Sequence, residues 1–135
     1  MNGKLEAFTQ AANGHIPMNY NPTDALARID NDHALLCMLI DVFLKERDGY
    51  ITRLQGACNK QDLGLLGDAA HNVKGASAAI GLEDCRALAE SLEVACRQSG
   101  VKSISSFENA TAGLVAALKE CEPHLNAWKE KNRRG

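Results

Sequence analysis

Residues 104–128, ISSFENATAGLVAALKECEPHLNAW, carry the strongest periodic pattern in the chain. Apolar side chains, with one threonine among them, recur here every three or four residues, which places them along one face of an α-helix. That face consists of Ile104, Phe107, Thr111, Leu114, Leu118, Cys121, Leu125 and Trp128. Ser105 and Glu108 have the spacing of a capping box, so we expect the helix to begin at Ser105. The stretch predicts a long amphipathic helix whose apolar face other helices must cover.

Three earlier stretches repeat apolar residues at the same helical spacing, and each is bounded by residues that start or stop helices. We expect these helices over residues 32–58, 63–80 and 83–100. Asn31 and Asp62 precede the first two, and short polar side chains of this kind cap the free N–H groups of a helix N-terminus. Gly81 follows the helix over 63–80 and Gly100 ends the helix over 83–100, because glycine readily takes the left-handed conformation that ends a helix.

A short helix is expected before these four, from Pro22 to Ile29, with Asn21 as its cap. Four long amphipathic helices joined by short loops predict an all-α chain, an antiparallel four-helix bundle with a short additional N-terminal helix. We expect a tail or linker with room for one short helix over residues 1–20, the bundle domain over 21–132, and a disordered C-terminus over 133–135.

Composition and charge argue against nucleic-acid binding and against membrane insertion. The chain has 135 residues and a formal net charge of −2. A nucleic-acid-binding face needs clustered basic residues, and the one basic cluster, at Lys129, Lys131, Arg133 and Arg134, is expected to be a solvated helix end. There is neither a signal peptide nor an apolar stretch long enough to span a bilayer. We therefore expect a cytoplasmic protein that neither binds nucleic acid nor inserts into membranes.

Five cysteines are spread over the predicted helices, at Cys37, Cys58, Cys85, Cys96 and Cys121. No two have the Cys-x-x-Cys spacing, and four fall on apolar stripes, where a free thiol behaves as a small hydrophobe. We expect reduced core cysteines rather than disulfides or a zinc site.

Among the four histidines, His71 has the most distinctive surroundings. Residues three, four and seven positions apart share a helix face. The face of His71 carries Gly64, Gly67, Asp68, Lys74, Gly75 and Ala78. We expect the imidazole to face solvent beside one cation and few bulky groups. An imidazole is a nucleophile near neutral pH, and an ammonium one turn away can offset the charge of an acquired phosphoryl group. The other three, His15, His33 and His124, are expected to be ordinary surface residues.

Gly64, Gly67 and Gly75 occur within one predicted helix, although each costs about 1 kcal/mol of helix stability relative to alanine. Small residues beside His71 let the surface of a second protein approach the imidazole closely. The residues alone leave two other interpretations open, namely helix–helix packing against small side chains and an exposed histidine without a function.

Residues 70–81, AHNVKGASAAIG, resemble the signature of the histidine phosphotransfer (HPt) domain family. That signature is His-x-x-Lys-Gly, then a serine two residues later and a glycine four further on. All of its fixed positions are matched, by His71, Lys74, Gly75, Ser77 and Gly81. The pair Leu92–Glu93 with the later Gly100 also resembles the family, and the helix order agrees from about Asn21 to Trp128.

The resemblance implies a phosphocarrier in a multistep His–Asp phosphorelay, with no catalytic site of its own. It implies that His71 is phosphorylated, that Lys74 steadies the phosphate, and that Gly75 gives clearance for docking. Ser77 lies on the inner stripe, where its hydroxyl can bond back to the Val73 carbonyl. The implied partners are receiver domains of response regulators or of a hybrid sensor histidine kinase. The chain is expected to be a monomer without cofactor or metal, with Mg²⁺ held by the partner receiver.

Three alternatives stand beside this function: the phosphorylatable domain of a chemotaxis-type kinase, a helical scaffold without phosphotransfer, and a metal site in the bundle. The metal site is disfavoured because no Glu-x-x-His pair points inward. Leu35, Met38 and Val42 form a second apolar stripe beside the core stripe of the long helix. It covers either the short N-terminal helix or a receiver domain, and we favour the first.

Overall fold

The computed structural model describes residues 19–98 and 104–133. These ranges contain the helices α2 (Thr23–Ala27), α3 (His33–Asn59), α4 (Leu63–Ala79), α5 (Glu83–Arg97) and α6 (Glu108–Arg133), and the short 3-10 helix η1 (Ile104–Phe107). They contain no strand, so the predicted all-α class is confirmed. The predicted tail lies outside the described residues except for its last two, and so do residues 134–135. Arg133, expected in the disordered terminus, is instead the last residue of α6.

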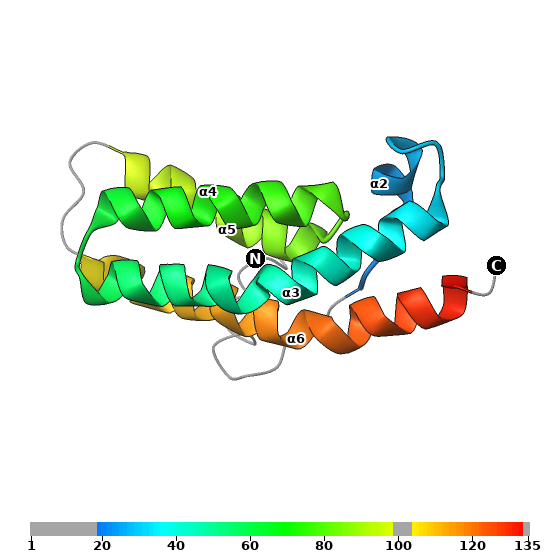
Figure 1. Cartoon of the computed structure of the whole chain (residues 1–135). Coiled ribbons are helices and arrows are strands. Elements are labelled where there is room, and N and C mark those ends of the chain that lie inside the picture. Colours follow the sequence, from blue (N-terminus) through cyan, green and yellow to red (C-terminus); the bar gives the residue numbers. More distant parts are fainter. Residues whose placement is uncertain (1–18, 99–103, 134–135) are drawn as a thin grey trace.

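The four long helices form the predicted antiparallel bundle (Figure 1). α4 packs on α3 and α5, and α6 packs on the same two helices from the other side, so the four enclose one core. Its largest fully buried side chains include Leu36, Ile40, Leu54, Leu66, Leu92, Leu114, Leu118 and Leu125. The short α2 lies at one end of the bundle, beside the start of α3 (Figure 1). No helix of the described ranges is long and apolar enough to cross a membrane.

Short acidic side chains start α3 and α4. The carboxylates of Asp32 and Asp62 each accept a hydrogen bond from the backbone N–H three residues later, at 2.9 and 3.0 Å. These bonds satisfy donors that have no partner within the helix. The cap predicted at Asp62 is confirmed. The cap predicted at Asn31 is wrong, because Asn31 has a positive φ of 56° and Asp32 takes the position before the helix.

Three helices have bounds that differ from those that their sequence patterns predict. α2 stops before Ile29, because the chain turns through a left-handed conformation that includes Asn31. α5 gives way to an extended conformation at Gln98. α6 begins at Glu108 rather than at Ser105, because the residues before it form a 3-10 turn. The interpretation of Ser105 as the cap of this helix is therefore wrong.

The segment before α3 covers the end of α4. Arg28 Nη2 donates a hydrogen bond to the Ala78 carbonyl at 2.7 Å, and the Tyr20 hydroxyl donates one to the Ile80 carbonyl at 2.6 Å. Carbonyls at the C-terminal end of a helix have no partner within the helix, and contacts of this kind satisfy them. The Ala78 carbonyl also accepts a hydrogen bond from the backbone N–H of Gly81 at 3.1 Å. Gly81 follows with a φ of 71°, the left-handed conformation expected for the residue that ends this helix.

An aromatic cluster closes the same end of the bundle. Trp128 of α6 packs edge-on against Tyr20, with ring centroids 6.2 Å apart. Trp128 also stacks on the imidazole of His33, with ring centroids 5.8 Å apart and an interplanar angle of 6°. His33 is exposed as expected, but it contacts the cluster rather than lying free on the surface.

The five cysteines are free thiols, in agreement with the sequence, and Cys85 and Cys121 are fully buried. The favoured role of the second apolar stripe is wrong. Leu35, Met38 and Val42 are 37, 63 and 57% exposed, because α2 covers the end of α4 rather than this face of α3.

Candidate functional site

His71 lies in the middle of α4, on the side opposite the core. Leu66, Ala70 and Val73 anchor the helix with fully buried side chains, whereas the His71 side chain is 61% exposed. The helical period produces this contrast, because neighbouring residues point about 100° apart around the axis. The predicted exposure of the imidazole is confirmed.

Glu93 of α5 holds one nitrogen of this ring. His71 Nδ1 lies 2.8 Å from Glu93 Oε2, within hydrogen-bond distance. A carboxylate only accepts hydrogen bonds, so the neutral imidazole carries its proton on Nδ1 and keeps the lone pair on Nε2. No hydrogen bond to Nε2 occurs among the residues that the structure describes. The arrangement leaves a solvent-exposed nucleophilic nitrogen with a fixed tautomer.

Lys74 binds the other oxygen of the same carboxylate. Its Nζ lies 2.8 Å from Glu93 Oε1, and the Glu93 side chain is only 14% exposed. The Lys74 ammonium, together with His71, holds the pKa of the Glu93 carboxyl below its usual range, against the opposing effect of burial. Glu93 therefore stays ionised near neutral pH and can hold the Nδ1 proton.

Arg97, one turn further along α5, adds a second cation. Its Nη2 lies 2.8 Å from Asp68 Oδ1 and 3.8 Å from Glu93 Oε2. The charged groups in contact around His71 are thus two cations and two carboxylates. We call His71, Lys74, Glu93, Arg97 and Asp68 the His71 cluster.

The three glycines of α4 have different surroundings. A Cβ on Gly75 would meet nothing within 4 Å, so the predicted clearance beside His71 exists there. A Cβ on Gly67 would lie 3.0 Å from the Arg97 guanidinium, and one on Gly64 would lie 3.3 Å from the Asp62 carboxylate. The expectation that all three leave room for a partner is wrong for Gly67 and Gly64, where the space is used within the chain.

The structure thus brings His71, Lys74 and Gly75 together on one face, as the sequence predicts. It contradicts the expectation of a single cation and few bulky groups, because α5 adds Glu93 and Arg97. Helix periodicity within α4 gives no information about a neighbouring helix. The back-bond expected from Ser77 is also absent, since its buried hydroxyl has no hydrogen-bond partner among the described residues.

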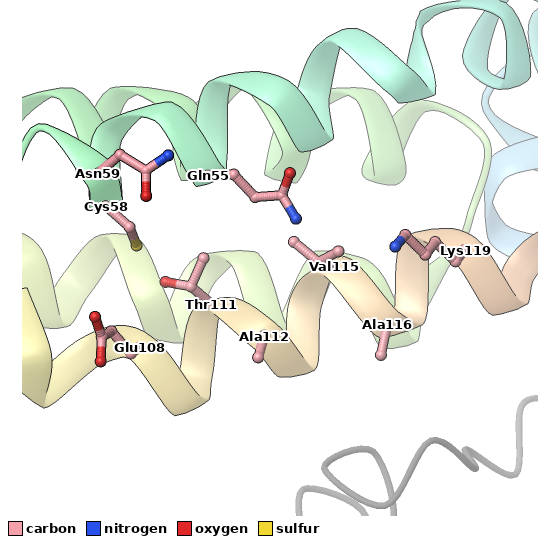
Figure 2. Close-up of a pocket in the computed structure, with 9 residues that line it drawn as sticks. All are labelled: Gln55, Cys58, Asn59, Glu108, Thr111, Ala112, Val115, Ala116 and Lys119. Carbon is pink, nitrogen blue, oxygen red and sulfur yellow. The ribbon is translucent and has the colours of Figure 1, made fainter.

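A hollow between α3 and α6 lies apart from the His71 cluster. Figure 2 shows the residues that line it: Gln55, Cys58, Asn59, Glu108, Thr111, Ala112, Val115, Ala116 and Lys119. It includes no residue of the His71 cluster and no histidine. Within residues 19–98 and 104–133, no group of three or more His, Cys, Asp or Glu side chains has an arrangement that could hold a metal ion.

Comparisons with known proteins agree with this geometry. The family model described as "Hpt domain" matches residues 38–127. The fold is similar to that of the HPT domain from an Hpt sensor hybrid histidine kinase of Shewanella, with a TM-score of 0.71 and 17% sequence identity. This similarity covers 82% of the present chain and 93% of the Shewanella domain. Comparison with curated protein sequences finds no significant match.

Proposed function

Because the chain belongs to the Hpt domain family and is a histidine phosphotransfer protein of a phosphorelay, we propose that His71 is the residue that carries its phosphoryl group. The observation that carries this assignment is that one nitrogen of the His71 ring is hydrogen-bonded and the other faces solvent. Nδ1 is held at 2.8 Å by Glu93, while the side chain is 61% exposed and Nε2 is available to a partner. His33, the other well-exposed histidine among the described residues, stacks on Trp128 instead.

The transfer begins with the lone pair of His71 Nε2, which attacks the phosphorus of an aspartyl phosphate on a receiver domain. The N–P bond forms as the P–O bond to the aspartate breaks, and the electron pair of that bond returns to the aspartate carboxylate. Nδ1 keeps its proton, so positive charge develops on the ring. The ionised Glu93, at 2.8 Å from Nδ1, offsets that charge. The reverse steps pass the phosphoryl group to the next aspartate.

Lys74 and Gly75 serve the phosphoryl group rather than the ring. The group brings a charge of roughly −1.5 to −2 at neutral pH, and the Lys74 ammonium is one turn from His71 on the exposed side of α4. The open space at Gly75 lets the receiver bring its aspartate close to Nε2. Catalysis and the required Mg²⁺ come from the receiver, and this chain acts as a monomeric carrier in the cytoplasm without a cofactor of its own.

The receiver also needs an apolar surface to dock on. Leu35, Met38 and Val42 leave such a surface on α3. Exposed apolar side chains that gather on one face indicate protein–protein contact. The α3 stripe therefore serves as part of the receiver-binding face, the second of the two uses that its sequence pattern allows.

Phosphorylation from a charged receiver tests the assignment. A receiver domain loaded with acetyl phosphate should transfer an acid-labile, base-stable phosphate to the wild-type chain. His71→Gln should melt at the wild-type temperature and take no label, because an exposed residue contributes little to stability. His33→Gln and His124→Gln serve as matched controls and should label normally. Labelling that persists in His71→Gln would overturn the assignment, and a folded wild type that takes no label would favour a scaffold.

A further inference from the structure

Arg97 is a cation of the His71 cluster that the transfer described above does not use. It comes from α5 and reaches across to α4, where it pairs with Asp68 at 2.8 Å. The same Nη2 atom lies 3.8 Å from Glu93 Oε2, the oxygen that holds His71 Nδ1. One short movement of the guanidinium would exchange one carboxylate for the other.

The backbone of α4 makes a place for this guanidinium. Gly67 is buried although it lies one turn from the exposed His71, and Arg97 is the side chain that covers it. A Cβ at Gly67 would lie 3.0 Å from both Cζ and Nη1 of Arg97, and 3.3 Å from Nε. By contrast, the glycine at position 75 has open space around it. The absence of a side chain at residue 67 therefore serves Arg97.

Charge balance in the cluster changes when His71 is phosphorylated. In the unphosphorylated chain, Lys74 and Arg97 are matched by Glu93 and Asp68. A phosphoryl group adds negative charge on the outer side of the ring, and Lys74 can turn toward it only by leaving Glu93 Oε1. Without a replacement cation, the largely buried Glu93 would lose one of the two partners that keep it ionised, which costs free energy.

We infer that Arg97 is a positioning residue that takes over the charge of Glu93 when Lys74 turns to the phosphoryl group. In this arrangement Arg97 moves from Asp68 to Glu93, Glu93 keeps its hydrogen bond to His71 Nδ1, and Lys74 remains free to contact the phosphate. A planar guanidinium can exchange between two carboxylates in this way without leaving its place against Gly67. The inference rests on the proposed phosphorylation of His71.

A double-mutant cycle on the full chain tests the coupling. Arg97→Met should shorten the half-life of the phosphohistidine by roughly two- to fivefold, the effect of one partly exposed ion pair. In a Lys74→Ala background the same change should have no further effect, because there is then no lysine for Arg97 to release. Arg86→Met is the matched control, since Arg86 also lies on α5 but pairs with Glu83 and Glu90. Equal effects of Arg97→Met in both backgrounds would overturn the inference.

Gly67→Ala offers a second way to displace the guanidinium without removing it. Alanine favours the helix, while its Cβ should push Arg97 away and shorten the phosphohistidine half-life in the same direction as Arg97→Met. A purely structural role for Arg97 predicts instead that each change in half-life follows a change in melting temperature. A shorter half-life at unchanged or raised melting temperature supports the inference, and an unchanged half-life in Gly67→Ala contradicts it.

The NMR chemical shifts of the His71 ring nitrogens in the unphosphorylated chain separate this inference from the proposed function. Because Arg97 lies 3.8 Å from the Glu93 oxygen that holds Nδ1, Arg97→Met should shift the Nδ1 and Nε2 resonances, and Arg86→Met should leave them unchanged. Absence of the shift would overturn the coupling of Arg97 to Glu93. If the shift is present but the wild-type chain takes no label, the phosphorylation of His71 is overturned, and so is the exchange inferred from it. The coupling of Arg97 to Glu93 would still be established.

Discussion

Two of the groups of charged side chains that join neighbouring helices in this bundle differ in which partner is shielded. In the His71 cluster between α4 and α5, the holding acid Glu93 is 14% exposed and His71 is 61% exposed. Between α3 and α6, Arg47 is 18% exposed and lies 2.8 Å from Glu122, which is 47% exposed. The His71 cluster shields the carboxylate that orients the ring and exposes the imidazole. The second shields a permanent cation and presents no nucleophile to solvent.

The difference shows that an ion pair across two helices does not by itself indicate a functional site. Such pairs often contribute little or only hold two helices in register. The His71 cluster differs because a titratable ring has one nitrogen held and the other available. Changes in the His71 cluster should therefore alter phosphotransfer at constant stability, and changes in the Arg47 pair should do the opposite.

The largest expected effect concerns Gly75. Gly75→Gln and Gly75→Leu should fold normally, because a Cβ there meets nothing within 4 Å. Their side chains should keep the receiver's aspartate away from Nε2, and a misplacement near 1 Å can slow transfer by about a hundredfold. Gly75→Ala should raise the melting temperature through helix propensity and transfer at a similar or mildly reduced rate. Melting curves and single-turnover transfer on the same preparations check this, and a destabilised Gly75→Leu would contradict it.

Arg47 should show the reverse behaviour. Arg47→Ala should lower the free energy of unfolding by about 2 kcal/mol, because it removes a mostly buried side chain and its ion pair. Arg47→Met keeps most of the apolar stem and should recover much of that loss. Arg53→Ala, an exposed arginine of the same helix, should change stability little. Urea unfolding measures all three, and transfer from a charged receiver should be unchanged. A slowed transfer in Arg47→Ala would remove the distinction between the two clusters.

A change at Leu35 tests whether the exposed stripe of α3 contributes to receiver binding, as the His71 cluster contributes to phosphotransfer, or to stability. Leu35→Glu should melt like the wild type, because Leu35 is 37% exposed. It should weaken receiver binding by roughly tenfold, the effect of losing one apolar contact at an interface. Val94→Glu is the matched control, since Val94 is a 51% exposed residue of α5 outside the stripe. Titration calorimetry with the receiver measures the difference, and a destabilised Leu35→Glu would restore the packing role.

The smallest effect concerns Cys121, next to the Arg47 pair. Burial raises the pKa of the Cys121 thiol to about 11, against the opposing effect of Arg47. An unfolded chain releases this proton from about pH 9, so the folded state binds more protons between these values and stability falls as pH rises. The loss attributable to Cys121 should be about 1 kcal/mol at pH 10. Denaturation at pH 8 and pH 10 should show a smaller difference in Cys121→Ala, and an equal slope would exclude the thiol as its source.

The sequence predicts best what depends on one helix alone. The cap at Asp62, the left-handed Gly81 and the exposure of His71 all follow from local chemistry and helical period, and all are confirmed. The same local rules give wrong helix caps at two positions. Asp32, rather than Asn31, caps α3, and Ser105 lies in a 3-10 turn before α6 begins.

Contacts between helices could not be read in the same way. The position of Glu93 and Arg97 beside His71 depends on how α5 is rotated against α4, and no periodicity within one helix contains that angle. The resemblance to the HPt family includes Glu93 without assigning it a role, so a signal was present but uninterpreted. The prediction that the short N-terminal helix covers Leu35 is wrong for a related reason, because the exposure of that side chain depends on where α2 docks.

The aromatic cluster at the end of the bundle has a practical consequence for spectroscopy. Trp128 is the only tryptophan of the chain, and its ring partners, Tyr20 and His33, belong to the segment before α2 and to the first residue of α3. Neither partner belongs to the His71 cluster. Intrinsic fluorescence therefore reports on whether the N-terminal segment is seated against α6, and it can follow unfolding in phosphorylated and unphosphorylated samples alike without an added dye.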